Sequence, residues 1–255
     1  MSHKLTAAAL LATALLAGCD DEKTRYVDQI VENPVEVPEL AITGAVQGFW
    51  LMDAEQHCAS CVHDRSAYGN PLLATDAQLT ELPALPAAGE AGQLGSTLTL
   101  DGNTRLITGE DAVFSHTVLG ETFTLHLRSR SSADTLETAL TLGSPTLGNA
   151  FSVQQRDDVL VLHFAAQGRR VLVPLDGDGW QDLHLVATPE RVSVSLNCEP
   201  VEQFVPLSGA PLISRSATRL MVGGAWQAND APGFSGSLDW LRISQAEEAA
   251  PFCTE

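Results

Sequence analysis

The stretch RLMVGGAWQANDAPGFSGSLDWLRIS, residues 219 to 244, contains two segments in which apolar and polar residues alternate. RLMVGG (219–224) and SLDWLRIS (237–244) each have the period of two that is typical of a half-buried β-strand. The residues between them include glycine, asparagine and proline, which favour a loop. The stretch therefore predicts two strands joined by a loop.

The same alternation recurs upstream, in FTLHLRSR (123–130), VLVLHF (159–164) and RVSVSLN (191–197). Almost no segment has the apolar period of a long amphipathic helix. We therefore expect an all-β fold, an antiparallel sandwich, in which the segment 76–92 is the principal loop. Turn-forming residues separate the runs: Asp101-Gly102-Asn103, Gly148-Asn149, Gly168 and Asp176-Gly177-Asp178-Gly179.

The chain is strongly acidic, with 32 Asp and Glu residues against 14 Lys and Arg and a formal net charge of −18. Such a surface repels nucleic acid and anionic lipid headgroups, so no nucleic-acid partner is expected. Two explanations stay open, a generally acidic exported protein and a protein that meets divalent cations.

The N-terminus, MSHKLTAAALLATALLAGCDDE, has one lysine, a short apolar run and then an acidic segment, which is the layout of a secretory signal peptide. Leu16-Ala17-Gly18-Cys19 resembles the lipobox of bacterial lipoproteins, which implies cleavage before Cys19 and acylation of that cysteine. The alternative is an ordinary cysteine in an apolar helix. Two or more acyl chains give stable membrane attachment, and Asp20 resembles the signal for inner-membrane retention.

These features predict three parts of the chain. Residues 1–18 are expected to be the signal peptide and residues 19–43 a lipidated acidic tether, since Pro34 and Pro38 interrupt a segment without a regular period. Residues 44–255 are expected to form one β-sandwich domain. The mature protein would then be anchored in a bacterial cell envelope and face the periplasm or the cell surface.

Four motifs resemble laminin G-like, pentraxin and thrombospondin N-terminal domains, in the order in which those domains carry them. The resemblance implies a concanavalin A-like jelly roll of two packed antiparallel sheets. The motifs are HDRSAYGNPL (63–72), GSTLTLDG (95–102), GWQDLHLVATPERVSVSLNCEPV (179–201) and the stretch 219–244.

The cysteines divide into local and distant candidates. Once Cys19 is acylated, four remain, and four cysteines allow three pairings. The resemblance to the thrombospondin type implies that Cys198 bonds to a cysteine near the C-terminus, for which Cys253 is available. The pairing we favour is Cys58 with Cys61 and Cys198 with Cys253.

The motif HCASCVHD (57–64) brings two cysteines and two histidines together. Haem attachment requires a histidine directly after Cys-x-x-Cys, and Val62 intervenes here, so no haem is expected. Zinc binding by all four side chains would strain so short a loop, and no βαβ context supports a thioredoxin-like role. A local disulfide is favoured in an oxidising compartment, and a metal site is the alternative.

Calcium is the cofactor that the resemblance implies, held at one rim of the sandwich by side-chain and backbone oxygens. Candidate ligands are Asp64, Asn70 and Asp101, each of which is equally well explained as a turn former. Asp239, inside a predicted strand, is expected to anchor a neighbouring loop by hydrogen bonds.

No catalytic constellation is evident. Glycoside hydrolases need two carboxylates about 5 to 9.5 Å apart, and no such pair stands on a confident strand. The serine and histidine residues form no nucleophile elbow, so we expect no enzyme. Trp50, Trp180 and Trp240 are expected in the core, whereas Trp226, in the loop AWQANDAPG (225–233), is predicted to bind ligand.

Two functions follow from this reading. The first is a lipid-anchored, non-catalytic recognition module that binds a glycan or a protein at the envelope. The alternative is a structural accessory subunit of an envelope complex, and an enzyme related to glycoside hydrolases is the least favoured.

Overall fold

A computed structural model describes residues 43–53, 58–86, 88–112, 114, 121–131, 133–214, 216, 218–227 and 232–250. In these residues the regular structure is sixteen β-strands and one short 3₁₀ helix, η2 (Ala165–Gln167). Within the same ranges no helix has the length and apolar character needed to cross a membrane. The predicted signal peptide, Cys19, Asp20, His57 and Cys253 lie outside the described residues.

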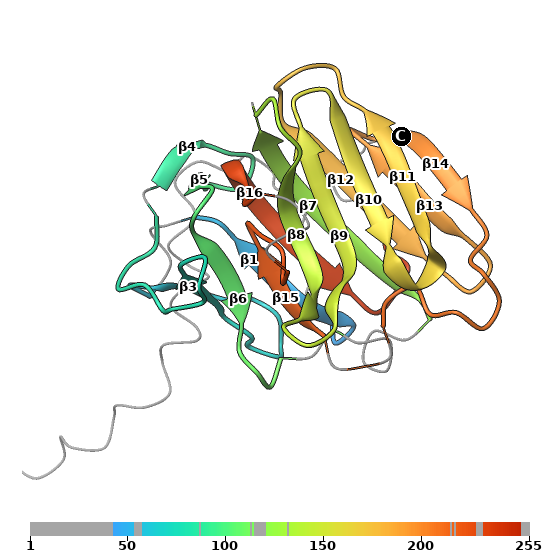
Figure 1. The fold of residues 1–255 in the computed structure, drawn as a ribbon, viewed down its shortest axis with the longest axis horizontal. Coiled ribbons are helices and arrows are strands. Elements are labelled where there is room, and N and C mark those ends of the chain that lie inside the picture. Colours follow the sequence, from blue (N-terminus) through green and yellow to red (C-terminus); the bar gives the residue numbers. More distant parts are fainter. Residues whose placement is uncertain are drawn as a thin grey trace, which may run out of the picture. The chain divides into compact units, whose positions relative to one another are not determined.

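The strands form two antiparallel sheets, which pack face to face (Figure 1). In sheet A the order is β14 (Glu199–Phe204), β13 (Val192–Leu196), β12 (Gln181–Ala187), β7 (Phe123–Ser131), β16 (Ser235–Ser244), β5 (Ser96–Asp101) and β4 (Ala88–Ala91), and β1 (Val46–Leu51) also pairs with β16. In sheet B it is β11 (Arg169–Pro174), β10 (Val159–Phe164), β9 (Gly148–Arg156), β8 (Glu137–Ser144), β15 (Arg219–Val222), β6 (Arg105–Thr108), β3 (Leu72–Thr75) and β2 (Cys61–Val62).

The stretch 219–244 supplies an interior strand to each sheet. β15 lies between β8 and β6 in sheet B, and β16 lies between β7 and β5 in sheet A. Strands that are far apart in sequence therefore pair side by side, as they do in a jelly roll. The predicted all-β sandwich of two antiparallel sheets is confirmed, and β10 coincides with the predicted segment 159–164.

The core lies between the inner faces of the two sheets. Along β12, Leu183 and Leu185 point into the core, while Asp182 and His184 alternate with them on the outer face of sheet A. The period of two predicted this alternation, because successive side chains of a strand point to opposite faces. One expectation needs correction: the segment 76–92 contains the short strand β4, which pairs with β5.

Two further segments complete the sandwich. Leu82 and Leu85 in the loop before β4 pack against the main core. After β16, the C-terminal segment (245–250) crosses sheet A, where the Thr124 hydroxyl donates to the carbonyl of Ala246 over 2.7 Å. Glu248 of this segment accepts two hydrogen bonds from the Arg242 guanidinium, at 2.8 and 2.9 Å.

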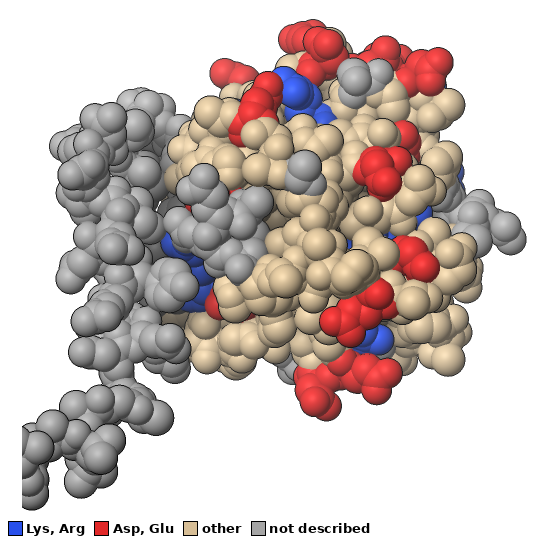
Figure 2. Space-filling view, turned by 90° about the vertical axis from the view of Figure 1, so that its left-hand side faces the viewer, with Lys and Arg blue, Asp and Glu red and all other residues tan. Residues whose placement is uncertain are grey.

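Acidic side chains are spread over the surface shown in Figure 2, where basic side chains are few. This agrees with the net charge of −18. The strong negative charge therefore belongs in part to the folded domain.

Candidate functional site

Asp64 organises the turn after β2. Its Oδ1 accepts hydrogen bonds from the backbone N–H groups of Phe49 (2.9 Å) and Ser66 (2.8 Å), and its Oδ2 accepts from the Ser66 hydroxyl (2.7 Å) and the Asn70 N–H (2.8 Å). The carbonyl of Asn70 accepts from the indole N–H of Trp50 over 2.8 Å. The turn brings Asp64 and Asn70 together, and their polar groups are used to hold it.

Asp101 lies in a different turn, between β5 and β6. Its Oδ1 accepts from the backbone N–H groups of Asn103 (2.9 Å) and Thr104 (2.8 Å). These hydrogen bonds, with that of Thr104 the largest cause, lower the pKa of Asp101. The recorded contacts of Asp101 are thus with its own turn, and none of them joins it to Asp64 or Asn70.

The hydrogen bonds of Asp64 and Asp101 are those of turn-forming residues. Calcium takes six to eight oxygen ligands, and both oxygens of Asp64 accept two hydrogen bonds each in the turn. In the described part of the chain, no group of three or more His, Cys, Asp or Glu side chains could hold a metal ion. Calcium binding by Asp64, Asn70 and Asp101 stays a prediction.

The motif around Cys58 is a local clasp. Cys58 and Cys61 form a disulfide next to β2, which confirms the predicted local pairing. Their sulfurs are bonded to each other and offer no thiolates to a metal. Cys198 is disulfide-bonded as well, and the predicted pairing with Cys253 falls on a residue outside the described ranges.

Trp226 does not stand out from the surface. Its side chain is 9% exposed and packs with Ile107 and Met221 on the outer face of sheet B. The Arg219 guanidinium lies over its ring at 5.4 Å, and Gly143 has no room for a side chain because a Cβ there would come within 2.7 Å of the indole. Ligand binding by Trp226 stays a prediction, but its ring is not an exposed stacking platform.

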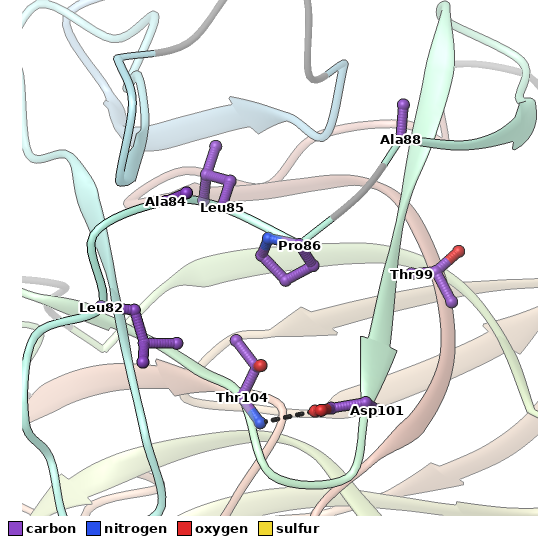
Figure 3. A pocket seen from close by; sticks show the side chains of 8 residues that line it. All are labelled: Leu82, Ala84, Leu85, Pro86, Ala88, Thr99, Asp101 and Thr104. Carbon is purple, nitrogen blue, oxygen red and sulfur yellow. Dashed lines mark hydrogen bonds between the residues drawn. The ribbon is translucent and has the colours of Figure 1, made fainter.

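A shallow hollow of about 620 Å³ lies beside β5 (Figure 3). Its walls are mostly aliphatic, and the only charged side chain that lines it is Asp101, which already bonds the N–H of Thr104. Small-molecule sites usually add several convergent polar groups to an apolar wall. The lining residues are Leu82, Ala84, Leu85, Pro86, Ala88, Thr99, Asp101 and Thr104.

Polar groups converge instead on the outer face of sheet A, around Arg128 of β7. Asp182 of β12 stands opposite Arg128 in the strand register and forms an ion pair with it. On the other side, Oδ2 of Asp239 lies 3.1 Å from Nε of Arg128. One guanidinium thus joins carboxylates from strands on both sides of β7.

Asp239 also holds the turn that follows β4. Its Oδ2 accepts the backbone N–H of Gln93 over 2.6 Å, which confirms that Asp239 anchors a neighbouring loop. Gly92 permits this approach, because a Cβ at that position would lie 2.4 Å from Asp239 Oδ1. The Asp239 side chain is fully buried and is a structural support of the face.

The ring of Trp180 lies against the guanidiniums of Arg128 and Arg130. The guanidinium carbons of Arg128 and Arg130 are 5.2 and 5.3 Å from its ring centre, within the range of cation–π contact. Its indole N–H donates to Glu90 Oε1 over 3.1 Å, and the same carboxylate lies 2.7 Å from Arg130. Trp180 is half-buried and is absent from the core clusters, so the expectation that it is a core residue is wrong.

We call Trp180, Arg128, Arg130, Asp182 and Glu90 the Trp180 face. Burial raises the pKa of Asp182, and the adjacent Arg128 offsets part of that effect. Burial likewise raises the pKa of Asp239 beneath the face, with the Gln93 N–H opposing it. The face combines an aromatic plane with planar donors and acceptors held in fixed positions.

The Trp180 face was not singled out from the sequence, although part of its signal was visible. Trp180 and Asp182 are two residues apart, as are Arg128 and Arg130, so each pair shares one face of its strand region. What alternation could not reveal is that β12 pairs with β7 and that β4 approaches them. The convergence depends on strand order.

Comparisons with known proteins bear on the fold. No protein-family model and no curated protein sequence matches this chain. Among solved structures, the binding domain of botulinum neurotoxin serotype D/C is similar, with a TM-score of 0.58 and 9% identity over 82% of this chain. That match spans 50% of the neurotoxin chain, so this chain covers about half of its length.

Two other matches come from carbohydrate-active enzymes. Domain 4 of an extracellular arabinanase from Geobacillus stearothermophilus has a TM-score of 0.55 and 14% identity, over 79% of this chain and 92% of that domain. A sialidase from Trypanosoma rangeli has a TM-score of 0.53 and 12% identity, over 83% of this chain but 32% of its own. At such low identity the likeness establishes the β-sandwich fold alone.

Proposed function

We propose that the chain is a non-catalytic recognition module that binds a glycan on the Trp180 face. The observation that carries this proposal is the position of Trp180, half-buried on the outer face of sheet A and held there by Arg128, Arg130 and Glu90. A partly open indole offers an apolar plane, and the fixed charged groups beside it offer hydrogen bonds. Sugar rings present an apolar face and a rim of hydroxyl groups, which match both.

The same geometry argues against catalysis at this face. Asp182 and Asp239 come from different strands, but both are paired with Arg128, and the Asp239 side chain is fully buried. A general acid or base must reach the proton that it transfers. Neither carboxylate is free to do so, which supports a binding role.

Structural neighbours give further support. The arabinanase domain was solved in complex with arabinotriose, and the botulinum D/C binding domain in complex with SialylT and, separately, with rat synaptotagmin II. Chains that contain this fold therefore occur in complexes with glycans and with a protein. The resemblance of the four sequence motifs to laminin G-like domains is a further reason to propose a recognition role.

A lipid-anchored location completes the proposal. Acylation of Cys19 after removal of residues 1–18 would hold the domain at the cell envelope, facing the periplasm or cell surface. Asp20 favours the inner membrane. A recognition module in this position would meet envelope or extracellular glycans.

A second candidate, an accessory subunit of an envelope complex, is favoured by one observation. Apolar side chains are exposed on β11, on β14 and just beyond β14, where edge strands of the two sheets adjoin through the ion pair of Arg169 with Glu202. Exposed apolar patches often mark protein contacts. These side chains are Leu172, Val201, Val205 and Leu207.

A glycan array probed with the detergent-solubilised full chain tests the proposal. We expect binding of at least one glycan class, and Trp180→Ala should weaken it about tenfold, since a stacked aromatic ring is worth up to about 1.5 kcal/mol. Tyr68→Ala is the matched control, because Tyr68 is an exposed aromatic residue (51%) that contacts Ser66 and Gly44, away from this face.

Melting temperatures of both variants would show that they fold. Equal binding by the wild-type chain and Trp180→Ala would overturn the assignment of the site. Absence of glycan binding together with co-purification of one envelope protein would favour the accessory role.

A further inference from the structure

We infer that the Trp180 face selects uncharged glycans over acidic ones, and that Asp182 determines this selectivity. This inference rests on the proposed glycan-binding function and specifies its ligand class. It follows from the balance of charges around Trp180, from the partners of each guanidinium and from the exposure of the side chains.

The charges around Trp180 do not cancel once Asp239, beneath the Trp180 face, is counted with them. Two guanidiniums, those of Arg128 and Arg130, lie among three carboxylates, those of Asp182, Asp239 and Glu90. Both guanidiniums are already matched: Arg128 with Asp182 and Asp239, and Arg130 with Glu90 over 2.7 Å. No positive charge in this group is left to attract an acidic sugar.

The accessible part of the group is more negative than the buried part. The side chains of Glu90, Arg130 and Asp182 are 45%, 36% and 28% exposed, two carboxylates against one guanidinium, whereas Arg128 is 17% exposed and Asp239 is fully buried. A glycan that stacks on Trp180 therefore meets more negative than positive charge, because the one well-exposed guanidinium, Arg130, is already paired with Glu90. The strongly acidic surface of the whole chain adds to the repulsion.

Neutral glycans avoid this penalty. Their hydroxyl groups donate hydrogen bonds to carboxylates, and charge-assisted bonds of this kind are stronger than neutral ones. An acidic glycan would bring a carboxylate or sulfate close to Asp182 and Glu90 without an available cation. Specificity obtained by repelling the wrong ligand is a common device in binding sites.

Asp182 is the specificity-determining residue because it is the more exposed of the two carboxylates that neutralise Arg128. Asp182→Asn removes one negative charge and leaves an amide of nearly the same size. The charge of Arg128 is then matched only by the buried Asp239, and an acidic ligand gains an attraction. One unit charge at about 6 Å and an effective dielectric constant of about 40 changes affinity about tenfold.

Asp158→Asn is a matched control. Asp158 also pairs with an arginine, Arg156, at 2.6 Å, in the turn between β9 and β10 of sheet B. The substitution changes the net charge of the chain by the same amount without touching Trp180. It separates the local effect from the general effect of charge.

The test uses the full chain and pairs of glycan probes of which one member carries carboxylates and the other does not: oligogalacturonate and its methyl ester, and xylo-oligosaccharides whose glucuronate branches are intact or have been reduced to glucose. For the wild type and Asp158→Asn we expect at least one neutral member to bind at least about tenfold more tightly than its acidic partner. Asp182→Asn should reduce that ratio to about one to two, and about 0.5 M salt should shrink the wild-type ratio.

Three results would overturn the inference: acidic members that bind the wild type as tightly as neutral ones, an unchanged ratio in Asp182→Asn, or an equal loss of selectivity in Asp158→Asn. Failure of the proposed function looks different. In that case no member of the panel binds, or Trp180→Ala binds every member as the wild type does.

Discussion

Asp64 and Asp182 show how one residue type serves two purposes in this molecule. Asp64 accepts hydrogen bonds mainly from its own turn, with donors such as Ser66 and Asn70 two and six residues away. Asp182 is joined to Arg128, 54 residues away, in a neighbouring strand. The first carboxylate holds a backbone turn, and the second shapes a surface.

Replacing Asp64 should therefore destabilise the fold without affecting a cofactor. In Asp64→Ala the Phe49 and Asn70 N–H groups lose their acceptor, and we expect the free energy of unfolding to fall by about 2 to 3 kcal/mol. Urea denaturation measures this change. Asp76→Ala is the control, because Asp76 accepts hydrogen bonds from two N–H groups in an exposed turn. We expect this substitution to lower the free energy of unfolding by less than about 1 kcal/mol.

Calcium provides the second arm of that experiment. If Asp64 is only a turn former, calcium leaves the melting temperature of the wild type unchanged, because a ligand stabilises a fold only by binding it. A rise in melting temperature with calcium that disappears in Asp64→Ala would contradict this account. It would restore the metal site that the resemblance implied.

At the scale of elements, β15 and β16 pair with strands that come from much earlier parts of the sequence. Each strand is interior to its sheet and has neighbours on both sides. β16 is the longer and pairs with β7, β5 and β1. Each sheet therefore has an interior strand from the stretch 219–244, which is why this stretch is informative about the fold.

Shortening a side chain in β16 should lower the free energy of unfolding more than shortening one on an edge strand. Leu241→Ala removes a fully buried side chain from the main core, and we expect a loss of about 2 to 5 kcal/mol in unfolding free energy. Leu172→Ala, on the edge strand β11 with 67% exposure, should change it by no more than about 0.5 kcal/mol. Similar losses in both variants would argue against the observed strand order.

At the scale of the whole molecule, the C-terminal segment covers a buried histidine pair on sheet A. The rings of His126 and His184 meet edge to face at 4.2 Å, and His184 Nε2 lies 3.0 Å from the carbonyl of Glu248. Burial is the main cause that lowers the pKa of both histidines, well below the ordinary value for His126. Arg242 and Trp240 also face His126, and Arg242 lowers its pKa further.

This arrangement predicts acid sensitivity. A histidine whose pKa is lower in the folded state binds protons more readily when the chain is unfolded. Its full contribution to the free energy of unfolding is therefore present above about pH 6.5, and it is lost as the pH falls toward the pKa of the folded state. We expect unfolding free energy to drop by about 2 kcal/mol between about pH 7 and pH 5. Urea titrations at several pH values measure this drop.

The control is a double variant, His126→Gln with His184→Gln. The raised pKa values of Asp182 and Asp239 act in the opposite direction, since those carboxyls bind protons more readily in the folded state. The difference between wild type and double variant isolates the histidine contribution. A double variant with the same pH dependence as the wild type would contradict the prediction.

The sequence by itself determined what depends on near neighbours. Alternation predicted the strands and the faces of their side chains, the spacing of Cys58 and Cys61 predicted a local disulfide, and the turn after β2 was visible around Asp64. Each of these features is decided within a few residues, by backbone geometry and short-range bonding.

Tertiary structure alone decided which faces meet. Arg128, Asp182 and Glu90 come together because β12 pairs with β7 and because the segment of β4 approaches Trp180. It also buried Trp226, which the sequence places in a loop, against Ile107 and Met221. The physical reason is that alternation specifies the face of a strand but not its neighbour, and strand order is set by packing of the whole core.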